Sequence, residues 1–234
     1  NEEKIGERFQ METKYRSRTA PRKKTSLESQ KVLEVLSLPP VLPWGEEPLG
    51  EVFRRRRSLR EFLREPLSIQ ELSQSLWATQ GITAQQGPYD FRTSPSAGAL
   101  YPIDTYPIVN RVDGLRAGIY RLKPRDWELE LLKEGDFSRK TAQACLQQEM
   151  AARAAVVLAW VAVVERSKWK YRERTYRYIY LDAGHIGQNL YLAATALGLG
   201  CCTIGAFFDE EIDGLLGVDG LQETTVYLGA VGKV

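Results

Sequence analysis

The longest regular pattern of apolar residues in the chain lies between Tyr178 and Leu197. Glycines at positions 184 and 187 lie within it, and since a glycine costs a helix about 1 kcal/mol relative to alanine, they indicate that another backbone approaches closely. The pattern predicts a core helix that Gly198 and Gly200 end with positive φ. Apolar residues recur every three or four positions, as one face of a helix requires, at Ile179, Ala183, Ile186, Leu190, Ala193, Ala194 and Leu197.

Shorter apolar runs predict the strands of a sheet. The run VVLAWVAVV at 156–164 is continuously apolar, which is typical of a central strand buried on both faces. CCTIGAF follows the core helix and predicts a second buried strand that ends in a glycine turn. Further strands are expected from about Asp104, in a pair around a turn at 123–126, and at 224–232.

Capping and helical periodicity predict the remaining helices. Ser68 and Glu71 have the spacing of a capping box and begin a helix that continues toward residue 82. Helices are also expected near 49–53, at 138–155 and after Asp209. Strands interleaved with helices imply an α/β or α+β sandwich built on one sheet.

The first fifth of the chain has a different character. Lysines and arginines dominate as far as Lys24, a short helical stretch is expected near 27–36, and four prolines in 37–50 exclude regular structure there. The apolar residues of this region are too many for a floppy tail. We therefore expect residues 1–48 to form an arm that packs on a core domain at 49–234.

Composition narrows the function classes. The formal net charge is +2 and 26% of residues are charged, which does not indicate a nucleic-acid partner. No apolar run approaches the roughly 20 residues of a membrane span. Three cysteines make no disulfide framework, so a reducing compartment, the cytoplasm, is expected. With one histidine and no CxxC pair, a metal site is not expected.

Three stretches carry residues suited to chemistry. Arg54–Arg57 with Ser58 and Arg60 is either a solvated charge run or an anion site, because guanidinium forks and a hydroxyl match a phosphate. The small residues of TSPSAGALYP form either a surface turn or a backbone that approaches a flat ligand. The segment WKYRERTYRYIY mixes basic and aromatic residues and is interpreted as the exposed start of the core helix, while His185 is interpreted as a core histidine.

The order of three motifs carries a family resemblance. RRSLREF (56–62), SPSAGALYPIDTY (94–106) and DAGHIGQNLYLAATALGLGCCTIGAF (182–207) together resemble the FMN-dependent nitroreductase superfamily. PSAGALYP and KYRERTYRYIYLDAGH are most similar to its SagB-type dehydrogenases, which include azoline oxidases of modified peptides. The resemblance implies an α+β fold, an α/β/α sandwich with one mixed, mainly antiparallel sheet, in a homodimer.

The resemblance also implies an FMN site. The FMN phosphate and ribityl chain would lie against Arg56, Ser58 and Arg60. The flavin ring would lie beside Thr203, Ile204 and Gly205, with the Gly205 amide near the nitrogen that accepts hydride. Many relatives have further basic residues near the C-terminus, and here only Lys233 remains. The other subunit would line the ring with Pro95, Ser96, Ala97 and Gly98.

A lysine–tyrosine pair implicated in catalysis by azoline oxidases matches Lys170 and Tyr171. Aromatising an azoline removes a proton and passes a hydride to flavin, and a lysine can take a proton only when neutral. The alternative is that the two are ordinary residues at a helix start. The expected function is oxidation of an azoline or related small ring or modified-peptide substrate, with other peptide-modifying enzymes as candidate partners. The alternatives are an NAD(P)H-dependent nitro- or quinone-reductase and a non-catalytic flavoprotein scaffold.

Overall fold

The computed structural model describes residues 4–16, 30–44, 47–87 and 89–234. Its centre is a seven-stranded sheet with the strand order β1-β6-β5-β4-β7-β9-β8, in which every neighbouring pair is antiparallel. Parallel pairing is confined to isolated bridges such as that between Tyr15 and Phe208. The strands are β1 (Glu34–Ser37), β4 (Ile103–Val109), β5 (Gly118–Lys123), β6 (Glu128–Glu134), β7 (Val156–Val163), β8 (Gly200–Ile204) and β9 (Glu223–Gly232).

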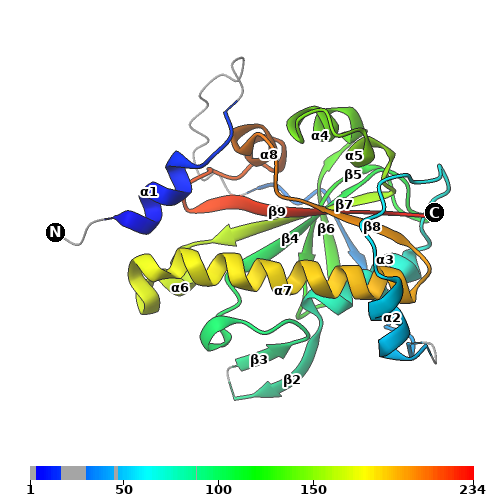
Figure 1. Cartoon of the computed structure of the whole chain (residues 1–234), viewed down its shortest axis with the longest axis horizontal. Coiled ribbons are helices and arrows are strands. Elements are labelled where there is room, and N and C mark those ends of the chain that lie inside the picture. Colours follow the sequence, from blue (N-terminus) through cyan, green and yellow to red (C-terminus); the bar gives the residue numbers. More distant parts are fainter. Residues whose placement is uncertain (1–3, 17–29, 45–46, 88) are drawn as a thin grey trace.

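Helices cover both faces of this sheet (Figure 1). One face carries α4 (Ser138–Ala144), α5 (Glu149–Arg153) and α8 (Asp209–Leu216), and the other carries α3 (Ile69–Gln80) and the long α7 (Thr175–Ala196). Each layer of helices closes its own hydrophobic cluster against the sheet. This is the α+β sandwich with one mainly antiparallel sheet that the sequence predicts.

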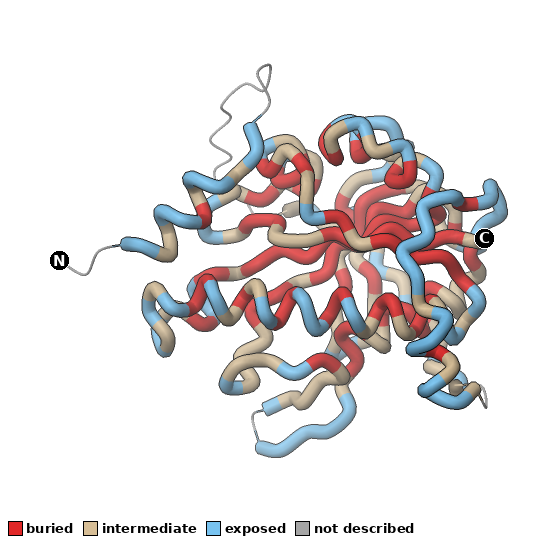
Figure 2. Tube along the Cα trace, viewed as in Figure 1, coloured by how far each residue is buried: buried red, intermediate tan, exposed pale blue. Residues whose placement is uncertain are grey.

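Strand β7 is buried on both faces, as its continuous apolar run predicts. Leu158 and Trp160 belong to the cluster under α7, whereas Val157 and Ala159 belong to the cluster under the opposite helices. Successive side chains of a strand point to opposite faces, so both faces of a central strand must be apolar. Figure 2 shows the sheet and the inner side of α7 as the buried centre of the molecule.

The core helix is confirmed, but its beginning and end differ from expectation. Arg172 has a φ of 51° and separates α6 (Glu165–Tyr171) from the single turn η2 (Arg172–Arg174), after which α7 starts. The first half of the basic–aromatic segment, 169–174, therefore lies in α6 and η2, whereas its second half, 175–180, is the start of the core helix, as expected. At the other end Gly198 has a φ of 69°, whereas Gly200 has no positive φ and instead begins β8.

Two further regions differ from the sequence prediction. The single helix expected at 138–155 is two helices, because Leu146 and Gln147 both adopt positive φ between them. A hairpin absent from the sequence-based expectations, β2 (Ile82–Gln86) and β3 (Tyr89–Arg92), lies below α7 in the view of Figure 1, and its Asp90 pairs with Arg125 of the β5–β6 turn. The loop after it contains the short turn η1 (Ala97–Ala99).

The helix expected near 27–36 is wrong where it can be tested. Residues 27–29 lie outside the described residues, and Glu34–Ser37 form the edge strand β1, paired with β6. Here the alternation of half-buried and exposed positions prevails over helical propensity, because pairing with a strand satisfies the backbone of the segment. Helix α2 (Leu49–Arg55) then precedes the basic turn.

The described residues of the N-terminal arm contact the core. Helix α1 (Ile5–Glu12) lies beside η2, where the Glu7 amide donates to the Glu173 carboxylate at 3.0 Å. The Lys14 ammonium is almost fully buried and lies 3.5 Å from the equally buried Asp213. It also donates to the Gly220 carbonyl at 2.7 Å and to the Thr224 hydroxyl at 2.8 Å. Among the described residues no helix is long and apolar enough to cross a membrane.

Candidate active site

The basic turn lies against strand β8. Its residues Arg56, Ser58 and Arg60 follow α2, and the amide of Leu59 within it donates to the Cys201 carbonyl at 2.9 Å. This bond holds the turn beside the strand that carries Thr203, Ile204 and Gly205. Two of the three predicted motifs therefore meet in one chain.

Tyr191 of α7 connects these two motifs. Its hydroxyl lies 2.9 Å from Ser58 Oγ and accepts hydrogen bonds from the Thr203 amide at 3.0 Å and the Thr203 hydroxyl at 3.2 Å. The Tyr227 hydroxyl donates to Thr203 Oγ1 at 2.6 Å and supports it from β9. Burial raises the pKa of Tyr227, so its hydroxyl stays protonated and remains a donor.

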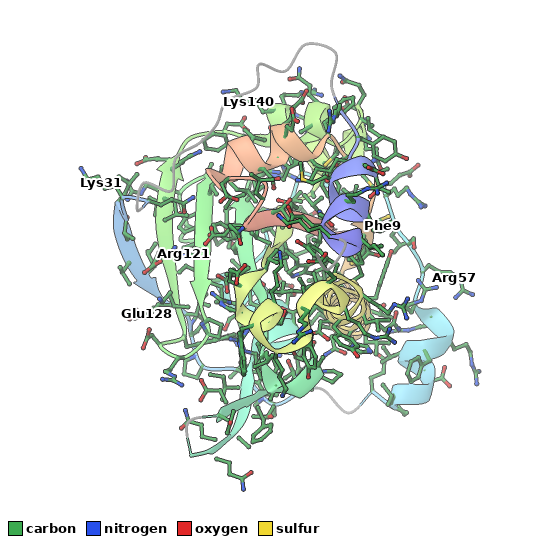
Figure 3. The ribbon with its side chains drawn as sticks, turned by 90° about the vertical axis from the view of Figure 1, so that its left-hand side faces the viewer. Phe9, Lys31, Arg57, Arg121, Glu128 and Lys140 are labelled. Carbon is green, nitrogen blue, oxygen red and sulfur yellow. The ribbon has the colours of Figure 1, made fainter. Side chains whose placement is uncertain are left out.

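The arginines of the basic turn differ in what neutralises them. Arg54 and Arg55 each pair with a glutamate, Glu51 and Glu47. For Arg56, Arg57 and Arg60, no carboxylate within the described ranges lies at ion-pair distance; the Arg56 guanidinium instead stacks 5.1 Å from the centre of the Tyr191 ring. Figure 3 shows Arg57 extending outward beside α2.

Lys233, the basic residue left near the C-terminus, has another partner. Its ammonium lies 2.5 Å from Glu71, whose carboxylate also accepts from the Ser68 amide to complete the predicted capping box of α3. Burial alone would raise the pKa of Glu71, but Lys233 and Ser68 hold it below its usual value. Lys233 therefore stabilises the start of α3, whereas Arg56, Arg57 and Arg60 of the basic turn have no carboxylate at ion-pair distance in the described ranges.

The PSAG loop, Pro95–Gly98, forms a second group on α7. Ser96 Oγ donates to Asp182 Oδ2 at 2.6 Å, and the Ala97 amide donates to Asp182 Oδ1 at 3.3 Å. Burial raises the pKa of Asp182, while these two hydrogen bonds favour its charged form. Asp182 thus fixes the loop to the helix from below, and Pro95 and Gly98 are exposed at its surface.

Lys170 and Tyr171 lie over this loop. A Cβ added at Gly98 would lie 2.7 Å from the Lys170 ammonium and closer still to the Tyr171 hydroxyl, and the φ of Gly98 is 64°. Only glycine meets both requirements. The Lys170 ammonium is 5.3 Å from the centre of the Tyr171 ring, whose other neighbour is the edge-on ring of Tyr178. Among the described residues no carboxylate pairs with Lys170.

The two groups are separated along α7. Asp182 and Tyr191 are nine residues apart, which is about 13 Å along a helix at 1.5 Å per residue. In the described part of the chain no hydrogen bond joins the PSAG loop to the basic turn or to Thr203–Gly205. A single chain therefore presents the predicted phosphate side and the predicted ring-lining loop as two sites.

The chemical types of the residues present are those that could bind a flavin mononucleotide. Arg56, Arg57 and Arg60, which pair with no carboxylate among the described residues, and the Ser58 hydroxyl match a phosphate. Exposed backbone at Gly205, where an added Cβ would lie 3.8 Å from Tyr227, leaves room for a flat ring to approach. Among the described residues, no group of three or more histidine, cysteine, aspartate or glutamate side chains could hold a metal ion.

Three residues of α7 have positions that the sequence did not predict. Tyr191 and Asp182 organise the two groups, yet their partners lie 133 and 86 residues away in the sequence, and only their places on the core helix could have drawn attention to them. His185 was interpreted as a core residue and this is wrong for the single chain, because it is exposed on α7 next to Gly184. Helical periodicity alone did not reveal that Gly184 and His185 lie on the exposed side of α7.

Comparison with known proteins places this geometry among relatives. The sequence model of the nitroreductase family matches residues 53–233. A protein of Methanocaldococcus jannaschii named "Putative nitroreductase MJ1384" is 39% identical over 193 residues, which is 82% of this chain and 94% of the relative. The "Trifolitoxin-processing protein TfxB" of Rhizobium leguminosarum bv. trifolii is 30% identical over 137 residues, 56% of this chain and 37% of TfxB.

A solved structure shares the fold. The "putative nitroreductase" of Anabaena variabilis superposes with a TM-score of 0.74 at 32% sequence identity. The match covers 86% of this chain and 41% of that one. The sheet order and the two helical layers described above are thus those of a known structural class.

Proposed function

The chain belongs to the nitroreductase family of oxidoreductases, and from this premise we propose that it is an FMN-dependent, SagB-type dehydrogenase that oxidises an azoline or a related ring in a modified peptide. FMN would be held by Arg56, Ser58 and Arg60 on one side and by Thr203, Ile204 and Gly205 on the other. The PSAG loop of a second copy of the chain would close the site, in a homodimer.

One observation carries the proposal. Lys170 and Tyr171 lie directly over the loop predicted to line the flavin, against Gly98, whose lack of a side chain leaves space for them. A break at Arg172, whose φ is 51°, ends their helix immediately afterwards. Backbone strain of this kind costs about 1–3 kcal/mol and is concentrated at functional sites.

These residues have the chemistry that azoline oxidation needs. Oxidation to the aromatic ring removes one proton and one hydride, a loss of two electrons and two hydrogens. FMN, when bound, supplies the hydride acceptor. The Lys170 side chain would take the proton from the ring carbon, and the Tyr171 hydroxyl would hold the substrate by a hydrogen bond. The electrons would leave to an external acceptor such as oxygen.

The relatives support both a peptide and a reductase reading. TfxB is named for processing trifolitoxin, which favours a peptide substrate. The M. jannaschii relative is named as a nitroreductase and covers more of the chain, which favours the second candidate, an NAD(P)H-dependent nitro- or quinone-reductase. In a third candidate, a flavoprotein scaffold of a peptide-modifying complex, the pair has no catalytic role.

The deciding experiment separates electron donors. The purified protein, reconstituted with FMN, is mixed anaerobically with NADPH or NADH, and in parallel with a thiazoline-bearing peptide. We expect the flavin absorbance to bleach with the peptide, with a mass loss of two hydrogens, and to bleach slowly or not at all with the nicotinamides. Rapid bleaching by NAD(P)H with turnover of a nitroaromatic and no azoline oxidation would establish the reductase instead.

A further inference from the structure

A cleft of about 510 Å³ lies between the β2–β3 hairpin and the ends of β4 and β5, next to the residues that follow the PSAG loop. Its walls are the β2–β3 hairpin, the loop at 99–101, the β5–β6 turn at 123–126 and helix α6. This volume is in the range of pockets that bind small molecules or a few residues of a peptide, about 300–1,000 Å³. The residues of the basic turn do not line it. Figure 3 shows Arg57 and Arg121 on opposite sides of the molecule, so the two basic regions are separate.

Basic residues from four elements line this cleft, and most have partners. Arg166 of α6 holds both carboxylate oxygens of Asp104 at 2.5 and 2.8 Å. Arg125 pairs with Asp90 at 2.8 Å, and Arg121 pairs with Glu130 at 2.6 Å. Within each pair the two charges neutralise each other, and the three pairs hold the walls of the cleft together. Two cations of the cleft, Arg92 and Lys123, pair with no carboxylate in the described part of the chain.

Arg92 is the more constrained of the two. Its guanidinium donates to Gln80 Oε1 at 2.7 Å and lies 4.8 Å from the centre of the Tyr101 ring, while its Nε is buried with no hydrogen-bond acceptor among the described residues. An arginine remains charged at any physiological pH. In the described part of the chain no carboxylate lies at ion-pair distance from its guanidinium, although Asp104 and Asp90 of the cleft favour its charged form from farther away. A negative group in the cleft would therefore stabilise it further.

The wall beside Arg92 is held in a strained conformation. Ala99 has a φ of 52° and Tyr101 a φ of 46°, although neither is glycine. The Tyr101 hydroxyl accepts a hydrogen bond from the Arg92 amide at 3.0 Å, and the Tyr101 amide donates to Ser96 Oγ at 2.9 Å. The cleft wall and the PSAG loop are therefore one short segment, held by shared hydrogen bonds.

The geometry points to a docking site for an acidic peptide segment, whose carboxylates would pair with Lys123 and Arg92. The inference of an anion site rests on the cations and the shape of the cleft. The inference that the anion belongs to a peptide rests on the proposed function. Arg166 lines the cleft one helical turn before Lys170, so a segment bound here leads toward the predicted catalytic pair. A single phosphate would fill only a small part of the volume.

Fluorescence anisotropy of the FMN-loaded full chain tests this without requiring turnover. The probes are a fluorescein-labelled peptide of alternating Glu and Ser and its Gln–Ser counterpart, with inorganic phosphate as a competitor. The test variant is Lys123→Glu at the end of β5. The matched control is Lys140→Glu, which makes the same change of net charge on α4, away from Arg121 in Figure 3. Arg92→Gln is added with a thermal melt that reports whether it folds.

We expect the Glu–Ser peptide to bind at least tenfold more tightly than the Gln–Ser peptide. Charge-assisted hydrogen bonds supply this discrimination. Lys123→Glu should remove that difference and Lys140→Glu should retain it, with affinity falling as salt is added. A folded Arg92→Gln should behave like Lys123→Glu. Equal binding of both peptides, an equal loss in both lysine variants, or complete displacement by millimolar phosphate would each overturn the proposal. If the acidic peptide binds while no azoline is oxidised, the docking site stands and the proposed reaction fails.

Discussion

The hydroxyl of Tyr191 lies 2.9 Å from Ser58 Oγ and joins α7 to the basic turn. The same oxygen accepts from the amide and the hydroxyl of Thr203, so a single phenol holds together two segments that the sequence separates by more than a hundred residues. This relationship makes the proposed FMN site sensitive to a residue that need not touch the cofactor.

Tyr191→Phe should therefore lower both the free energy of unfolding and the affinity for flavin. The variant loses hydrogen bonds to Ser58 and Thr203, each contributing about 1 kcal/mol, so unfolding in urea should show a loss of about 1–3 kcal/mol. Flavin fluorescence titration should show several-fold weaker FMN binding. Tyr178→Phe on the same helix is the control, because its partly exposed hydroxyl only accepts from Arg174 at 3.3 Å. Equal effects of the two substitutions would contradict the assignment.

Arg60→Ala tests the basic turn directly. Each charge-assisted hydrogen bond to a phosphate contributes about 1.5–3 kcal/mol, so FMN affinity should fall about tenfold or more. Arg54→Ala is the control, since Arg54 already pairs with Glu51. We expect a change of less than about twofold for it. A wild-type chain that cannot be reconstituted with FMN at all would sink both this prediction and the cofactor assignment.

Lys170→Ala and Tyr171→Phe should slow turnover without loss of flavin. A general acid–base group contributes about 10²–10⁴-fold in rate, and neither substitution removes an interaction with the basic turn. Trp169→Ala is the control at the neighbouring, largely exposed position. Reduction by dithionite should be unchanged because it needs no substrate proton. Wild-type rates on a thiazoline peptide in both variants would make the pair structural.

Gly184→Leu tests the dimer. An added Cβ at Gly184 meets nothing within 4 Å, whereas one at Gly187 would lie 2.8 Å from Tyr227, so only Gly184 can face a second chain without disturbing its own. Overpacking a helix contact costs about 1–3 kcal/mol. Sedimentation should show more monomer and loss of flavin. Gly214→Leu on α8, also with open space around it, should remain a dimer. A flavin-loaded wild-type monomer would exclude the shared site.

Asp209 should make stability depend on pH. Burial raises its pKa to about 6, with Lys14 opposing this. The folded chain then binds more protons than the unfolded chain between about pH 4 and 6, so the contribution of this group to stability falls as the pH rises through that window. Relative to Asp209→Asn, the wild-type free energy of unfolding should fall by about 1–3 kcal/mol between pH 4 and 7.

Urea titrations at several pH values measure this difference in the free energy of unfolding. The control is Glu210→Gln at an exposed position. A difference between wild type and Asp209→Asn that does not change with pH would show that Asp209 is not responsible.

Elements with a strong local pattern were predictable. The continuous apolar run of β7 and the periodic apolar face of α7 can be recognised from neighbouring residues alone. Burial of a strand on two faces, or of a helix along one stripe, produces such a local pattern. The capping box at Ser68 is equally local. The motif order indicated the family, and a family fixes a fold even where single elements are ambiguous.

The errors lie where distant contacts decide. Strand β1 is four residues long and depends on pairing with β6 about a hundred residues later. The break at Arg172 involves neither glycine nor proline, and it is stabilised by contacts that include Glu173 with the arm. Tyr191 and Asp182 could be placed on a helix from the sequence, but the direction of each side chain depends on loops that only the folded chain brings near.

The burial of Lys14 has a consequence for how the chain folds. Its partners Asp213, Gly220 and Thr224 lie about two hundred residues later, so a ribosome exposes the lysine long before it can be neutralised. Contacts of such large sequence separation form late, because the entropy of closing the intervening loop must be overcome first. We therefore expect the arm to dock late, because Lys14 is synthesised long before its partners. The contact of α1 with η2 would then form only after the last strand of the sheet has been synthesised.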